Sequence, residues 1–308
     1  MLLSIPWWRP PPFEIPLPAT SFLPPVLYVY PFGLLVALGV LVGVFAADRR
    51  ARQVGLHPRI CTELAGHVLI GAFVMAHVLD ALFYHFDQVL LRPWLVLELW
   101  NGMSSFGGFV GAAAGALVWK WRRGDSLVAF LDPIAWGFPM GWIFGRLGCF
   151  VTHDHPGRVT DFPLAVADYE IQDMLPPWQT RHDLGLYEAI GAAAISLLFV
   201  GLAFTKRKRG FYLALLPILY APLRFGLDFL RATDVPMHDP RWLGLTPGHY
   251  AAIVLLLAGG VMAWWVRSRP EVTVGKHARW PVEGPPARPY DSGDDAPRGD
   301  DARQAGPF

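Results

Sequence analysis

The chain alternates long apolar stretches with short polar ones. Seven apolar stretches carry few charged residues, and each approaches the roughly 20 residues that a helix needs to cross a ~30 Å hydrocarbon layer. Helices are expected because a backbone in lipid must satisfy its own hydrogen bonds, and the sequence lacks the short alternating strands of a barrel. The predicted fold is an all-α polytopic membrane protein with about seven transmembrane helices. Their ranges are 25–47, 64–86, 100–119, 126–145, 184–204, 211–230 and 248–266.

Composition agrees with a membrane protein. Of the 308 residues, 53% are hydrophobic and the mean hydropathy is +0.34, which exceeds what the core of one soluble domain of this length needs. The formal net charge of +1 gives no indication of a nucleic-acid partner.

The basic residues predict the orientation of the helices. With seven spans, the basic segments all fall on one side of the membrane, which the positive-inside rule assigns to the cytoplasm. We therefore expect an external N-terminus and a cytoplasmic C-terminus. The basic segments are 48–52, 120–123, 206–209 and the pair Arg267 and Arg269.

Three regions are predicted from this topology. Residues 1–24 form a proline-rich extracytoplasmic N-terminus, which lacks the apolar core of a cleaved signal peptide. Residues 25–266 form the transmembrane domain, with 147–183 as a small extracytoplasmic loop region. Residues 267–308 contain little apolar matter and are expected to be a disordered cytoplasmic tail. Cys61 and Cys149 fall on opposite sides, which predicts that they form no intramolecular disulfide.

Two arginines lie inside predicted spans, where an ionisable group is costly and faces a cavity or a partner by default. Arg146 closes the fourth span and Arg224 lies thirteen residues into the sixth, so both are expected toward the outer leaflet. Together they could bind a phosphate, and a lipid headgroup is the natural ligand. The predicted helical face that carries Arg224 also carries Tyr220, Asp228 and Arg231. The alternative is that Arg224 pairs with Asp228 while Arg146 snorkels to the interface.

A second polar group follows the fourth span. His153, Asp154 and His155 precede a Pro-Gly turn, and Cys149 and His182 could join them. General acid–base chemistry or simple solvated polarity is the favoured interpretation. A zinc site is a less favoured alternative, because no spacing here matches a known ligand motif, and no metal or other cofactor is predicted.

Five motifs resemble those of the prolipoprotein diacylglyceryl transferase family, over roughly residues 22–266. The strongest is GRLGCF at 145–150, followed by Gly157 and Arg158, which is similar to the family signature Gly-Arg, Gly-Asn-Phe and a closing Gly-Arg. The others, in the family's order, are GMSSFGG at 102–108, RHDLGLYEA at 181–189, LYAPLRFGLDFLR at 219–231 and RWLGLTPGHY at 241–250.

The resemblance implies roles for several residues. Arg146 and Arg224 would bind the headgroup of phosphatidylglycerol, with Tyr220 and Gly157 shaping the pocket. The implied reaction transfers diacylglyceryl from that lipid to the lipobox cysteine of a prolipoprotein signal peptide, in a bacterial inner membrane. His182 matches a motif position, as do Tyr187 and Glu188, without an assigned role.

The chain also departs from the family pattern. Phe106 stands in the place of the family's histidine, the usual candidate base, and Phe32 in that of a tyrosine. Cys149 replaces the signature asparagine. If the protein is an enzyme, His153 and His155 are the candidate replacement bases, and Asp154 matches a family glutamate. The alternatives are a transferase with another acceptor and a non-catalytic phospholipid-binding paralogue.

Overall fold

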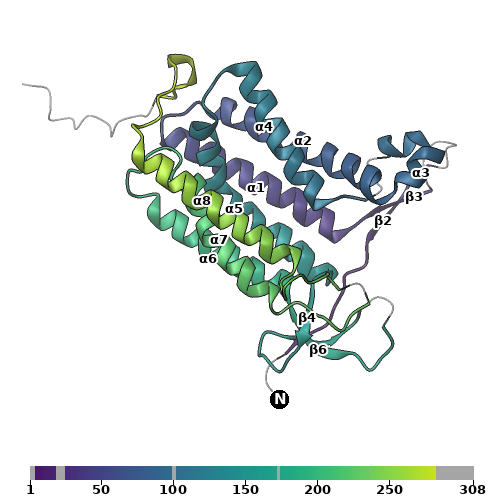
Figure 1. The fold of residues 1–308 in the computed structure, drawn as a ribbon. Coiled ribbons are helices and arrows are strands. Elements are labelled where there is room, and N and C mark those ends of the chain that lie inside the picture. The colour runs from purple at the N-terminus through teal and green to yellow at the C-terminus, as the bar shows by residue number, and fades with distance from the viewer. Residues whose placement is uncertain (1–3, 19–24, 99–101, 172–173, 237, 282–308) are drawn as a thin grey trace, which may run out of the picture.

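Seven long helices correspond to the seven predicted spans. The computed structural model describes residues 4–18, 25–98, 102–171, 174–236 and 238–281 of the chain. In these ranges, α1, α2, α4, α5, α6, α7 and α8 pack side by side, and the predicted all-α polytopic fold is confirmed (Figure 1). Their bounds are Pro31–Gln53, Pro58–Tyr84, Ser105–Arg123, Leu127–Thr152, Leu184–Leu202, Phe211–Asp228 and Pro247–Ser268.

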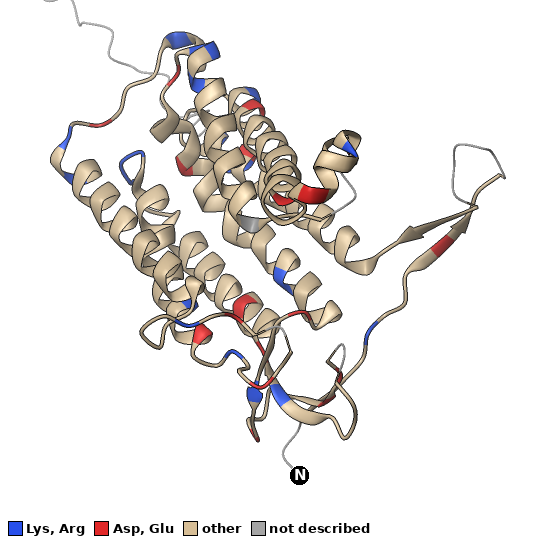
Figure 2. Ribbon diagram, turned by 45° about the vertical axis from the view of Figure 1, so that its right-hand side comes forward, with Lys and Arg blue, Asp and Glu red and all other residues tan. Residues whose placement is uncertain are grey.

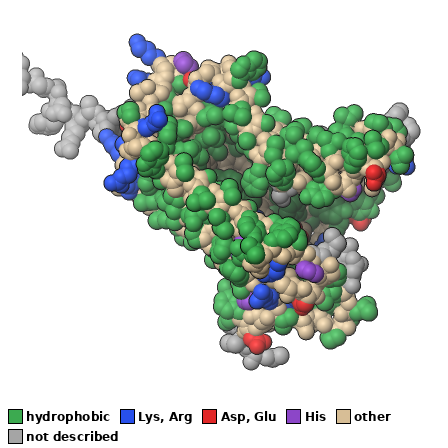
Figure 3. Space-filling view, in the orientation of Figure 1, with side chains coloured by type: hydrophobic (Ala, Val, Ile, Leu, Met, Phe, Trp, Pro, Cys, Tyr) green, Lys and Arg blue, Asp and Glu red, His purple; other side chains and the backbone are tan. Residues whose placement is uncertain are grey.

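Six of these helices have the length and apolar composition to cross a membrane. The helix that does not meet both criteria is α4, whose last turn carries Lys120, Arg122 and Arg123. Large apolar side chains cover the outside of the bundle, as in Figure 3, and Leu197 is 74% exposed. Such a surface is suited to lipid rather than to water, so the chain is a multi-pass membrane protein.

Figure 2 shows lysine and arginine near both ends of the bundle, and the basic clusters of the sequence share one of these ends. We call this end the basic end; it includes the last turns of α1 and α4 and the segment between α6 and α7. The opposite end, where α5 and α7 finish and α6 and α8 begin, is called the site end below.

The outer loop region and the N-terminus fold together as a small sheet at the site end (Figure 1). Its strand order is β1-β5-β6-β4, with β1 (Ile5–Pro6) parallel to β5 (Val166–Tyr169). Strand β6 (Gln179–Asp183) is antiparallel to both β5 and β4 (Pro156–Val159). A separate pair of strands, β2 (Phe13–Pro16) and β3 (Val26–Val29), precedes α1, and short helices α3 (Phe86–Leu91) and η1 (Pro93–Leu97) follow α2. The apolar-span pattern predicted none of these strands.

The segment after α8 differs from the predicted disordered tail. Its described part packs on the turn between α1 and α2, where the backbone N–H of His57 donates to Ala278 and that of Trp280 donates to Gly55. Val274 and Ala278 are buried there, near the short helix η2 (Lys276–Ala278). Composition averaged over the whole tail concealed these few apolar residues. The rest of the predicted tail, 282–308, lies outside the described residues.

Glycines allow two helix pairs to approach closely. A Cβ atom at Gly39 of α1 would lie 2.5 Å from the carbonyl oxygen of Gly141 in α5. At Gly111 of α4, a Cβ would lie 2.0 Å from the carbonyl oxygen of Gly71 in α2. Small residues at such contacts are the usual basis of helix packing in membranes, where lipid tails compete equally for apolar side chains.

The α2–α4 contact gives a first prediction. Gly111→Ala should destabilise the protein by about 1–3 kcal/mol, because the added methyl group meets backbone. Gly108→Ala, on the same helix, should be neutral, since its Cβ would lie 3.9 Å from its nearest neighbour outside the helix. Thermal unfolding midpoints in detergent measure both, and equal midpoints for the two variants would contradict the close packing.

Candidate active site

The two predicted arginines meet at one carboxylate. Glu188, near the start of α6, is fully buried, and its Oε2 atom lies 2.9 Å from Nε of Arg146 on α5. Its Oε1 atom accepts a hydrogen bond of 2.6 Å from Nη1 of Arg224 on α7. The Arg146 guanidinium also lies over the ring of Trp142, 4.5 Å from its centroid. The three helices at the site end are therefore joined by one buried cluster with two positive charges and one negative charge.

Further polar groups on α7 and α8 extend this cluster. Tyr220 donates a hydrogen bond of 2.8 Å to Oε2 of Glu188. Arg224 also pairs with Asp228, at 2.9 Å, as the alternative interpretation of the sequence anticipated. The hydroxyl of Thr246 donates to Asp228 and lies 2.9 Å from Nδ1 of His249, so the start of α8 is tied to the end of α7.

A cavity of about 520 Å³ opens beside Arg224. It lies between the α2–α4 pair and the start of α8, where Figure 3 shows the molecule hollowed. Arg231 and Asp80 contribute charged groups to its wall, and Phe106 contributes its ring. The residue that stands in place of the family's histidine thus lines the same cavity as Arg224, but its phenyl ring cannot accept a proton.

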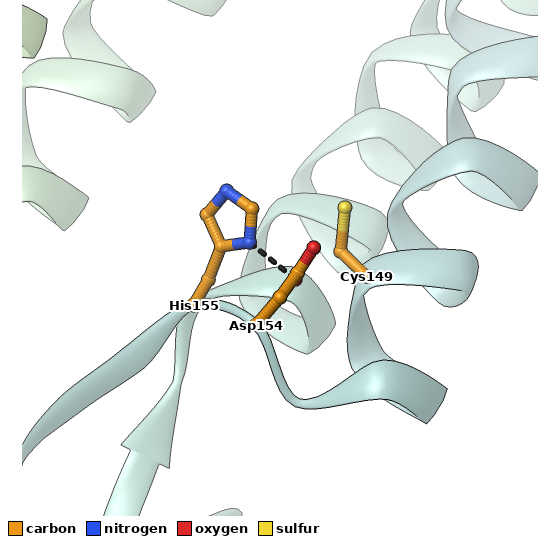
Figure 4. A group of neighbouring side chains, drawn as sticks. All are labelled: Cys149, Asp154 and His155. Atoms are coloured by element: carbon orange, nitrogen blue, oxygen red, sulfur yellow. Dashed lines mark hydrogen bonds and ion pairs between the residues drawn. The ribbon is translucent and has the colours of Figure 1, made fainter. Parts of the chain in front are cut away.

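Cys149, Asp154 and His155 form a second cluster where α5 ends (Figure 4). The Nδ1 atom of His155 lies 2.5 Å from Oδ1 of Asp154. Burial alone would lower the pKa of His155, but the hydrogen bond to Asp154 and the neighbouring Cys149 raise it to about 9, so the ring is protonated at pH 7. The Nη1 atom of Arg146 donates to Cys149 Sγ at 3.7 Å, which connects the two clusters.

His153 lies apart from both clusters and anchors the sheet. Its Nδ1 atom is 2.9 Å from Oδ2 of Asp183, and its Nε2 atom is 3.2 Å from the carbonyl oxygen of Trp8. The hydroxyl of Tyr169 donates to the backbone carbonyl of His153, and burial, with the Asp183 carboxylate, raises the pKa of that tyrosine. Both ring nitrogens of His153 are engaged by structural partners, the buried Asp183 and the backbone of Trp8, so this residue holds the site end together.

His182 and Gly157 occupy the sheet. The Nδ1 atom of His182 lies 2.9 Å from the hydroxyl of Tyr187, and burial lowers the pKa of this histidine below its ordinary value. A Cβ atom at Gly157 would lie 2.5 Å from the Cβ of His182 and 2.9 Å from the carbonyl oxygen of Leu230. Gly157 is therefore required for close packing of β4 between β6 and the chain after α7.

A buried arginine joins the same sheet to the loop after α7. Arg181 is 1% exposed, and its guanidinium donates to both carboxylate oxygens of Asp234, at 2.9 and 2.5 Å. The hydrogen bond from Arg181 lowers the pKa of Asp234 below its ordinary value of 3.8.

Glu188 is the site residue that the sequence left without a role. An acidic residue near the start of a predicted span is itself a signal, because a carboxylate at that depth needs a partner. Arg146 and Arg224, which lie in other predicted spans, were the natural candidates for partners of this carboxylate. The sequence does not determine how α6 is rotated about its own axis. This rotation decides whether the Glu188 carboxylate faces α5 and α7 or the lipid.

These observations define a multi-pass membrane protein with a paired-arginine site at one end of its helix bundle. The chain belongs to the prolipoprotein diacylglyceryl transferase family, whose model matches residues 19–265. A phosphatidylglycerol–prolipoprotein diacylglyceryl transferase of Chromohalobacter salexigens is 31% identical over 246 residues, which cover 79% of this chain and 90% of the relative. Proteins of the same name are 27% identical in Pseudomonas putida strain F1 and 26% identical in Pseudomonas fluorescens strain SBW25, over 79% and 80% of this chain and 91% and 92% of the relatives. The family resemblance of the motifs is thereby confirmed.

The buried carboxylate gives a second prediction. Glu188→Gln keeps the size of the side chain but leaves two buried guanidinium groups without their shared counter-charge. Breaking a buried ion pair in this way costs about 3–5 kcal/mol. Unfolding in detergent should show this loss, whereas Glu170→Gln, at an exposed position outside the helices, should leave the midpoint unchanged. A Glu188→Gln variant as stable as the parent would contradict the ion pairs.

A third prediction concerns pH. Because the pKa of Asp234 is lowered in the fold, its contribution to stability is present above the ordinary pKa of 3.8 and is lost as the pH falls through the lowered value. Asp234→Asn should lower the unfolding midpoint at pH 7, and the difference from the parent should vanish well below pH 3.8. Asp161→Asn, at an exposed position, serves as the control. A difference that persists unchanged in acid would contradict this assignment.

Proposed function

We propose that the protein transfers a diacylglyceryl group from phosphatidylglycerol to the thiol of the lipobox cysteine in a prolipoprotein signal peptide. The observation that carries this proposal is the convergence of Arg146 and Arg224 on Glu188 at one end of a membrane bundle. Membership of the family and the names of the relatives, which specify phosphatidylglycerol and prolipoprotein, support the same reaction.

The paired arginines suit a phosphate ligand. Glu188 and Asp228 balance the charges of the two guanidinium groups, but each guanidinium has five N–H donors, more than its protein partners use, so donors remain for phosphate oxygens. Glu188 and Tyr220 hold the two groups in position, so little ordering is needed when the lipid binds. The same charges stabilise the phosphate oxygen that becomes negative as the glyceryl carbon–oxygen bond breaks.

The nucleophile must be a thiolate, so the site must favour loss of the thiol proton. Asp154 and His155 lie next to Cys149, which contacts Arg146, and we assign them this task. The positive charge of the protonated His155 ring, which is held by Asp154, favours a thiolate nearby. His153 and His182 act through other residues: His153 fixes the loop that carries Asp154 and His155, and His182 supports the sheet next to Gly157. The sulfur then bonds to the glyceryl carbon as glycerol phosphate leaves with the electron pair of the broken bond.

The proposed orientation follows from the two ends of the bundle. The basic end would face the cytoplasm of a bacterium and the site end would face outward from the inner membrane. A prolipoprotein emerging across that membrane would then present its lipobox cysteine at the level of Arg146 and Arg224.

Phe106 favours a second candidate, a phospholipid-binding protein that does not transfer. This residue lines the cavity of Arg224 at the position where the family has its candidate base. The lipid-binding candidate shares the headgroup site with the transferase but forms no product. A transferase with another acceptor would also use that site, but it would form a different product.

The test is turnover of phosphatidylglycerol and a lipobox peptide by the purified protein in vesicles, followed by mass spectrometry. We expect diacylglyceryl peptide as the product. Arg146→Lys and Arg224→Lys should each lower the rate of its formation by about 100-fold, because the ammonium group of lysine cannot make the bidentate hydrogen bonds of a guanidinium group. Arg92→Lys, at an exposed position between α3 and η1, is the matched control.

Failure of a folded sample to form product, beside an active relative, would reject the transferase. Retained phosphatidylglycerol binding in that sample, lost in Arg146→Lys, would support the lipid-binding candidate. A modified lipid without modified peptide would indicate another acceptor.

A further inference from the structure

The end of α5 brings three metal-binding side chains together. Cys149 lies one turn before the helix ends at Thr152. The chain then reverses at His153, which adopts a left-handed conformation with φ of 52°, and this reversal returns Asp154 and His155 toward the helix. Figure 4 shows the three side chains approaching one another from the helix and the following loop.

The donor atoms are suited to zinc. One sulfur, one carboxylate oxygen and one imidazole nitrogen lie within 4.8 Å of one another. A tetrahedral zinc ion, with bonds of about 2.3 Å to sulfur and 2.0–2.1 Å to nitrogen, places such ligand atoms roughly 3.5 Å apart. The buried Cys149 is fixed, whereas the exposed Asp154 and half-buried His155 can turn by about an ångström to admit the ion.

The charges agree with the same ion. A thiolate and a carboxylate together neutralise a divalent cation, and the ion would displace the proton from the His155 ring. The Arg146 guanidinium donates to Sγ of Cys149 at 3.7 Å and holds that side chain in place. His153, anchored by Asp183 and Trp8, immobilises the loop between the ligands. Metal sites depend on such supporting contacts as much as on the ligands themselves.

Three protein ligands leave one position of a tetrahedral ion open, which is the arrangement of catalytic rather than structural zinc sites. A cavity of about 600 Å³, lined by Asp154 and by apolar residues that include Tyr30 and Phe32, adjoins this position. On its other side the cluster contacts Arg146 and thus the proposed headgroup site. An acceptor thiol could reach the ion from the cavity while the lipid is held by the arginines.

We propose that Cys149, Asp154 and His155 bind one zinc ion, whose open position takes the acceptor thiol as a thiolate. This inference rests on the proposed transferase function and supplies the nucleophile that Phe106 cannot generate. The bound thiol releases its proton to water; its sulfur forms the bond to the glyceryl carbon, and the carbon–oxygen bond breaks with its electron pair passing to the phosphate oxygen.

Cobalt(II) substitution tests the site without any turnover. Full-length protein, stripped of metal and titrated with cobalt, should bind one ion per chain and show a thiolate-to-cobalt charge-transfer band. The band should disappear in Cys149→Ser and remain in Cys61→Ser, the chain's other cysteine. Competition with a chromophoric chelator should show zinc binding at least about tenfold weaker in Asp154→Asn and His155→Gln. His238→Gln, at an exposed histidine, should bind as the parent does.

Addition of a lipobox peptide should shift the cobalt spectrum, and the same peptide with serine for cysteine should not. Absence of the band in folded parent protein, or a band unchanged in Cys149→Ser, would overturn the proposed site. An unfolding midpoint close to that of the parent shows that a variant has folded.

The two proposals fail separately. Metal and thiol binding without any diacylglyceryl peptide would reject the transferase and leave the zinc site standing. Transfer at full rate in metal-free protein would overturn the role of zinc and leave the transferase standing.

Discussion

The site end of this protein depends on one carboxylate held between two guanidinium groups. Glu188 has no exposure, and Arg146 and Arg224 have little, so these three charges are satisfied mainly by one another and by neighbouring protein groups. Removing Glu188 leaves Arg146 without a carboxylate partner and Arg224 with Asp228 alone, which is far more costly in a region of low dielectric constant than losing a surface ion pair. The positions of α5, α6 and α7 relative to one another are thereby restricted, and the headgroup site is a consequence of that restriction.

The same cluster links the transmembrane bundle to the sheet outside it. Arg146 contacts Glu188 on one side and Cys149 on the other, and α5 continues from there into the loop of Asp154 and His155. His153 fixes that loop to the N-terminal strand and to Asp183, which also caps α6 by accepting a hydrogen bond from Leu186. Helix geometry inside the membrane and loop geometry outside it are therefore determined together.

The length of the apolar stretches and the positions of the basic clusters predicted the parts of the structure that depend on nearby residues. The seven helices and the shared depth of Arg146 and Arg224 follow from span length and residue spacing alone. The sheet did not, because β1 and β5 come from segments about 160 residues apart and neither has a distinctive pattern of its own. The different roles of His153 and His155 could not be predicted either. The left-handed conformation of His153 reverses the chain, so that His153 is buried against Asp183 and His155 lies beside Cys149.

Whether Arg146 and Arg224 bind one anionic headgroup can be seen in an experimental structure of the protein in lipid nanodiscs containing phosphatidylglycerol. We expect a lipid whose phosphate oxygens lie within hydrogen-bonding distance of both guanidinium groups while Glu188 remains between them. Phosphatidylglycerol bound elsewhere, with the two arginines paired only to protein carboxylates, would show that the paired arginines are not the headgroup site.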